Sequence, residues 1–228
     1  LDRAAAFSQG TVVPRWIDPA DGRVTPDVVA EALDDDVTAL AVSHVDFRTG
    51  YRADLAALRE MIGPDRLLIV DAVQSFGVVD TDFRVADVVV GHGYKWLRAA
   101  RGTGFAWFSD LARERLAPVL SGITGTEGEG LAVDERPAPA ASARAFTTSG
   151  PDTLAAGRLA VGARTVRDAG IAAIEEHLAG RVDAVIEIAD RHGITVVSPR
   201  ERERRAGIVA LAPGEPARLA AALANAGL

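Results

Sequence analysis

Residues 67–97 read LLIVDAVQSFGVVDTDFRVADVVVGHGYKWL. Two runs rich in β-branched apolar residues stand in this stretch, at 67–70 and 86–90, and polar residues or glycine follow each of them directly. Short apolar runs of this kind are typical of strands that are buried on both faces, as in parallel sheets. The stretch therefore predicts two strands of an α/β protein.

The alternation of strands and helices continues outward in both directions. Further strands are predicted at 12–16, 38–43, 105–108, 194–197 and 208–211. Helices are predicted at 26–33, 55–62, 152–168 and 171–192, and from residue 216. This pattern predicts an α/β fold with a mainly parallel sheet flanked by helices. We expect a large domain at 1–168 and part of a small αβ domain at 169–228.

The composition limits the classes of protein to consider. The chain of 228 residues has a net charge of −7, so we expect no nucleic-acid partner. It has no cysteine, which excludes disulfides and thiolate zinc sites from this stretch, and we expect no metal. No apolar run reaches the roughly 18 residues of a membrane span, and the first residues lack the pattern of a secretory signal. We therefore expect a cytoplasmic protein without a membrane partner.

Polar side chains stand at the ends of three predicted strands. Ser43 and His44 close the first, Asp71 follows the second, and residues 91–95 (GHGYK) follow the third. Open α/β sheets bind their ligands beyond the carboxyl ends of the strands. A nucleotide-binding protein of the Rossmann type is the weaker interpretation, because the chain has no G-x-G-x-x-G between a strand and a helix.

Asp71 and Lys95 are the two residues at these strand ends whose side chains most clearly suggest a catalytic or binding role. A carboxylate directly after four apolar residues needs a partner, which is either the backbone of the following turn or a protonated ring nitrogen of a ligand. Lys95 is the only lysine, since the remaining 24 of 25 basic residues are arginine. A lysine near apolar walls is a usable amine nucleophile, whereas arginine cannot form an imine. The alternative is an ordinary surface lysine.

Four ordered segments resemble the class V aminotransferase family of pyridoxal-5'-phosphate (PLP) enzymes, which have fold type I. The segments are SHVDFRTG at 43–50, LLIVDAVQSFG at 67–77, ADVVVGHGYKWL at 86–97 and RGTGFAWF at 101–108. The separation of 24 residues between Asp71 and Lys95 fits the family. The family includes kynureninases, cysteine desulfurases, selenocysteine lyases and proteins like isopenicillin epimerase. Its members are longer at both ends, so we expect this chain to be truncated at both.

The resemblance implies a role for each residue at the strand ends. Lys95 would hold PLP as a Schiff base and then move protons at the substrate Cα. Asp71 would pair with the pyridine nitrogen, Gln74 would donate to the ring oxygen, and Val73 would pack against one ring face. Tyr94 would bind the phosphate.

Three further residues are predicted cofactor contacts on weaker grounds. His92 lies where desulfurases often have a phosphate-binding serine or threonine. Ser43 and His44 lie where the family places a residue near the ring oxygen. For His44 a packed histidine is an equal alternative.

The resemblance implies a PLP-dependent enzyme that acts on an amino acid, expected as a homodimer with its active site at the subunit interface. Lyase, desulfurase, aminotransferase and epimerase-like reactions all remain open. The Phe-x-Thr-Gly at 47–50 and the Tyr94-Lys95 pair favour lyase chemistry at Cβ slightly, whereas Gln74 is closer to the desulfurase pattern. The alternative of a different class is a PLP-binding fragment without catalytic activity.

Overall fold

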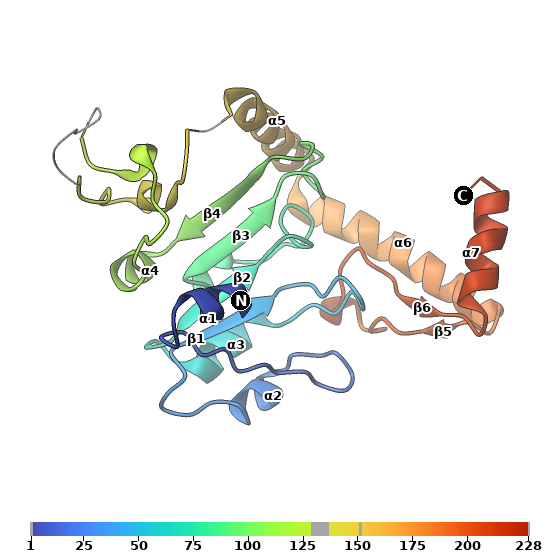
Figure 1. Ribbon diagram of the computed structural model, residues 1–228. Coiled ribbons are helices and arrows are strands. Elements are labelled where there is room, and N and C mark those ends of the chain that lie inside the picture. Colours follow the sequence, from blue (N-terminus) through green and yellow to red (C-terminus); the bar gives the residue numbers. More distant parts are fainter. Residues whose placement is uncertain (1, 129–136, 151, 228) are drawn as a thin grey trace.

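A four-stranded sheet forms the centre of the computed structural model, which describes residues 2–128, 137–150 and 152–227 (Figure 1). Its strands follow the order β1-β2-β3-β4, and the first three are parallel whereas the last is antiparallel to β3. They are β1 (Ala39–Ser43), β2 (Leu67–Asp71), β3 (Val88–His92) and β4 (Gly104–Phe108). The predicted α/β architecture with a mainly parallel sheet is confirmed.

Helices connect the strands and continue beyond the sheet. The α-helices are α1 (Asp2–Phe7), α2 (Pro26–Ala30), α3 (Leu55–Ile62), α4 (Asp110–Arg115), α5 (Thr153–Ala169), α6 (Ile171–Arg191) and α7 (Pro216–Asn225). The 3-10 helices are η1 (Phe83–Val85), η2 (Ile123–Gly125), η3 (Ala143–Phe146) and η4 (Arg202–Arg204). A two-stranded sheet, β5 (Thr195–Val196) and β6 (Leu211–Ala212), follows α6. None of the helices in the described ranges combines the length and the apolar character that a membrane span needs.

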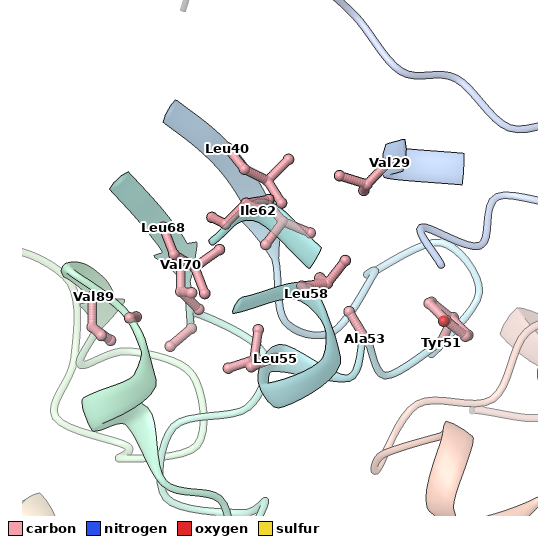
Figure 2. Close-up of a cluster of buried hydrophobic side chains, with 13 residues drawn as sticks. Val29, Leu40, Tyr51, Ala53, Leu55, Leu58, Ile62, Leu68, Val70 and Val89 are labelled. Atoms are coloured by element: carbon pink, nitrogen blue, oxygen red, sulfur yellow. The ribbon is translucent and has the colours of Figure 1, made fainter. Parts of the chain in front are cut away.

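The main hydrophobic core lies between one face of the sheet and helices α2 and α3 (Figure 2). Leu58 and Ile62 of α3 lie one helical turn apart and are fully buried, together with Val29 of α2. They pack against Leu68 and Val70 of β2. The packing of α2 and α3 against the sheet fixes the position of β2 and therefore of the residues at its carboxyl end.

The opposite face of the sheet is covered only in part. Near the amino ends of β2 and β3, Leu67 and Val88 pack against Ala112 of α4. Toward the carboxyl ends the same face is exposed at Ser43 and Asp71. Polar residues that follow the apolar runs therefore lie on an open surface.

The buried carboxylate of Asp87 links the start of β3 to β2. Asp87 precedes β3, and its Oδ2 accepts a hydrogen bond of 2.8 Å from the Leu68 backbone N–H and pairs with the Arg59 guanidinium. Its Oδ1 accepts from the Ser109 hydroxyl at 3.1 Å. A buried charge is tolerated when it is paired and hydrogen-bonded in this way. The network therefore keeps the two site-bearing strands in register.

One predicted strand was wrong. Residues 12–16 form no strand, and Val13 and Trp16 are exposed. Strand formation needs a partner for the backbone hydrogen bonds as well as an apolar pattern, and no strand among the described residues pairs with this segment.

Candidate functional site

The parallel register brings the predicted site residues to one edge of the sheet. Ser43 lies opposite Asp71 in the β1–β2 pair, and Asp71 lies opposite Val90 in the β2–β3 pair. His92 is two residues beyond Val90 and therefore lies on the same sheet face. All four residues are exposed. The carboxyl ends of the three parallel strands thus present one continuous surface, where a ligand can meet residues from each strand.

Asp71 uses one carboxylate oxygen for its own turn and presents the other toward Ser43. Its Oδ1 accepts a hydrogen bond of 2.8 Å from the Val73 backbone N–H. The Ser43 Oγ lies 3.5 Å from the Asp71 Oδ2. Turn capping and a ligand contact, which the sequence presented as alternatives, are therefore compatible. Oδ2 has only a long contact with a hydroxyl and is available as an acceptor.

Lys95 lies in the loop of residues 93–103 that connects β3 to β4. The backbone N–H of Arg98 donates to the Lys95 carbonyl at 3.0 Å, and that of Ala99 donates to the Gly93 carbonyl at 2.7 Å. The Lys95 side chain is partly buried. Among the residues that the structure describes, no carboxylate lies within ion-pair distance of its Nζ. The only lysine amine of the sequence is therefore held in a defined loop, and no acid in the described part of the chain neutralises it.

Tyr94 is surrounded by cationic or titratable groups. The Lys95 Nζ lies 5.3 Å from the centroid of its ring, and the Arg101 guanidinium carbon lies 5.2 Å from it. The ring of His92 meets that of Tyr94 edge to face, with centroids 5.1 Å apart. The cluster combines a phenol, an imidazole and two cations, which is a donor set suited to an anionic group such as a phosphate.

Val73 and Gln74 form the turn that follows Asp71, and both side chains are partly buried. The backbone carbonyl of Gln74 accepts a hydrogen bond of 2.9 Å from the indole Nε1 of Trp96. Trp96 was not among the predicted site residues. The sequence shows only that Trp96 directly follows Lys95, and this position does not reveal its contact with the turn after β2.

His44 is the predicted contact that the structure removes from the open surface. Its side chain is 1% exposed, and its ring lies edge to face with that of Phe83, with centroids 5.5 Å apart. Burial, followed by the charge of Arg52, lowers the pKa of His44 to about 3, and Asp54 opposes this in part. The burial favours the packed histidine, one of the two alternatives that the sequence left open.

The buried His44 predicts a loss of stability in mild acid. Its pKa is about 3 in the folded chain, compared with an ordinary value of 6.5. Between these values the unfolded chain binds one more proton, so the free energy of unfolding falls with falling pH, by up to about 1.4 kcal/mol per pH unit. Urea unfolding between about pH 6 and pH 4.5 measures this slope.

The variant H44Q should lose this part of the slope, because glutamine does not titrate. H177Q is the matched control, since His177 is exposed on α6, and it should keep the slope. An unchanged slope in H44Q would show that another group causes the acid sensitivity.

A second candidate is a cavity of about 380 Å³ between α6, η4 and the loops after β1 and β2. Its charged side chains neutralise one another. The Arg52 Nη1 lies 2.7 Å from the Glu175 Oε1, and the Arg202 Nη1 lies 3.1 Å from the Glu176 Oε1. None of the predicted site residues lines this cavity. The surface around Asp71 and Lys95 is therefore the better candidate for a functional site.

Comparison with known proteins identifies proteins that are similar to this chain in sequence and in fold. The chain is 25% identical over 189 residues to a kynureninase of Pseudomonas fluorescens, an alignment that covers 79% of this chain and 45% of that protein. A cysteine desulfurase from Thermococcus onnurineus NA1 has the same fold, with a TM-score of 0.86 and 22% identity over 100% of this chain and 57% of the solved one.

A second solved structure, a C-DES variant with glycine covalently linked to its PLP cofactor, has a TM-score of 0.73 and 17% identity over 84% of this chain and 51% of its own. The chain thus spans about half the length of the proteins that it matches. The characteristic sequence pattern of the family described as "Aminotransferase class-V" matches residues 3–228, almost the whole chain. The chain therefore belongs to the class V aminotransferase family.

Proposed function

We propose that this chain is the PLP-binding part of an enzyme that acts on an amino acid, with Lys95 as the covalent anchor of the cofactor. The observation that carries the proposal is the position of the only lysine. Lys95 has no acidic partner among the described residues and lies in the loop after β3. The carboxyl end of β3 and Asp71 lie on the same exposed surface of the sheet. An amine and a carboxylate on neighbouring strand ends suit the aldehyde and the ring nitrogen of PLP.

When bound, PLP stabilises negative charge that develops at the Cα of an amino acid. The residues of this chain would supply binding and proton handling. Asp71 would use its Oδ2 to hold a proton on the ring nitrogen, and Val73 would pack against the ring. Lys95 would carry protons to and from Cα. Tyr94 and His92 would bind the phosphate.

Ser43 and Gln74 would complete the site at the phenolic oxygen of the cofactor. Ser43 lies on the same exposed sheet face as Asp71, and Gln74 lies in the turn after it. The neutral side chains of Ser43 and Gln74 both provide hydrogen-bond donors, which an anionic ring oxygen would accept. His44 is not part of the proposed site, because its ring is buried against Phe83.

Among the reactions of the family, cleavage at Cβ is the class we favour. The kynureninase similarity over most of the chain supports it, together with the Tyr94-Lys95 pair. Desulfurase, aminotransferase and epimerase-like reactions are the alternatives, and the fold is shared with a desulfurase. A homodimer, a cytoplasmic location and a division into domains at 1–168 and 169–228 stay predictions.

The test is a titration of the purified protein with PLP, followed by visible absorbance, and then incubation with kynurenine, cysteine and alanine. The proposal expects a saturable visible band and a product from one of these amino acids. Anthranilate from kynurenine would identify Cβ cleavage, alanine from cysteine would identify a desulfurase, and pyruvate from alanine an aminotransferase. A band without any product would support the alternative of a PLP-binding protein without activity.

A further inference from the structure

Trp96 connects two parts of the candidate site that come from different strands. Its indole Nε1 donates a hydrogen bond of 2.9 Å to the backbone carbonyl of Gln74, which is 22 positions earlier in the sequence. Gln74 belongs to the turn after β2 that carries Asp71, whereas Trp96 directly follows Lys95 in the loop after β3. This bond therefore joins the turn with the carboxylate to the loop with the amine.

The other side of the indole rests on the C-terminal part of the chain. Trp96 packs against a buried cluster, and Leu178 of α6 and Ile208 belong to the same group of apolar side chains. A Cβ placed on Gly207 would lie 2.9 Å from the Trp96 Cη2 and 3.1 Å from the Leu178 Cδ1. The backbone of residue 207 thus approaches the ring so closely that a methyl group does not fit without movement.

Helix α5 supports the same loop from a second direction. A Cβ on Gly162 of α5 would lie 2.3 Å from the Leu97 carbonyl oxygen, so the helix backbone lies directly against the loop. Figure 1 shows α5 and the beginning of α6 beside the connection between β3 and β4. Within this loop Arg98 and Ala100 have φ angles of 52° and 65°, a region that non-glycine residues adopt only when their surroundings hold them there.

We propose that Trp96 is a positioning residue, which sets the position of Lys95 relative to the turn of Asp71 and Gln74 through its bond to the Gln74 carbonyl. Its ring also couples the loop of residues 93–103 to the segment 206–208, so that movement of this C-terminal segment changes the position of Lys95. The link to the cofactor rests on the proposed function, whereas the contacts between the two loops do not.

The experiment compares W96F with the parent chain by hydrogen exchange, without added cofactor. Phenylalanine keeps an aromatic ring in the cluster but has no N–H to donate. Amide exchange in segments 72–77 and 93–99 should become about 2- to 10-fold faster, the change expected from one net hydrogen bond. W107F is the matched control, because Trp107 lies on β4 and is exposed, and it should leave both segments unchanged.

Faster exchange in both segments, with α3 unchanged, supports the proposal. Exchange that stays the same in both segments overturns it, as does a uniform increase that includes α3, since that would show a merely structural role. Because these measurements use the protein without PLP, they remain decisive even if the proposed function fails.

Two further measurements test the coupling. In G207A the added methyl group meets the indole, so segment 93–99 should exchange faster although Trp96 and its N–H are intact. With PLP bound, the pH midpoint of the visible band should shift in both W96F and G207A and stay unchanged in W107F. A G207A protein with parent-like exchange in 93–99 would contradict the coupling to the C-terminal segment, and it would do so even if W96F proved unable to fold.

Discussion

Replacing Lys95 with arginine is expected to abolish the covalent attachment of PLP. Arginine keeps the positive charge beside Tyr94, but its guanidinium does not form an imine. Because Lys95 is the only lysine of the sequence, no other side-chain amine substitutes for it. Turnover should fall by at least about 10²–10⁴-fold, the range associated with loss of a positioned proton-transfer group. The visible spectrum and the rate of product formation measure the two effects.

The double variant K95R/R84K is the control for the position of the amine. Arg84 is a highly exposed residue of η1, so R84K places a lysine on the surface and outside the loop of residues 93–103. This variant should remain without the visible band of bound cofactor. Attachment of PLP in K95R alone, or its full return in the double variant, would show that Lys95 is not the anchor.

The second large effect is expected from D71N, which removes the charge at the end of β2 and keeps the shape. Asparagine Oδ1 can still accept the hydrogen bond from the Val73 N–H, so the turn should be preserved. Without the carboxylate, the ring nitrogen of the cofactor would lose the group that we propose keeps it protonated. Turnover should fall by about 10²–10³-fold, the scale of losing one electrostatic contact that stabilises a transition state. Steady-state kinetics measure it.

Attachment of PLP to Lys95 should persist in D71N, since the amine and its loop are unchanged. D110N is the matched control, because Asp110 is an exposed carboxylate at the first position of α4, and it should have parent activity. If D71N were as active as D110N, Asp71 would have only its role in the turn, which is the alternative that the sequence left open.

The elements that depend on local patterns were predicted well. The buried runs at 67–70 and 86–90 became β2 and β3, and the two long helices end within two residues of their predicted bounds. Apolar periodicity and capping residues determine such elements. The antiparallel direction of β4 has a different cause, because a loop of eleven residues, 93–103, turns the chain back without a helical crossover. That geometry depends on contacts with α5 that no local pattern reports.

The candidate site was predictable to the extent that it follows strand ends. Parallel strands carry their carboxyl ends to one edge, so Ser43, Asp71 and His92 could be placed together from the sequence. The burial of His44 could not be predicted from the sequence, because it depends on a contact with Phe83 from a later segment. The bond between Trp96 and Gln74 is likewise a tertiary contact, and a sequence motif records only that the tryptophan follows the lysine.

Reduction of the PLP-treated protein with borohydride, followed by peptide mapping by mass spectrometry, identifies the residue that holds the cofactor. We expect a single pyridoxyl group, on the peptide that contains Lys95. A protein that shows the visible band of bound cofactor but carries the label at its terminal amine, or carries none, would contradict the assignment of Lys95 as the anchor.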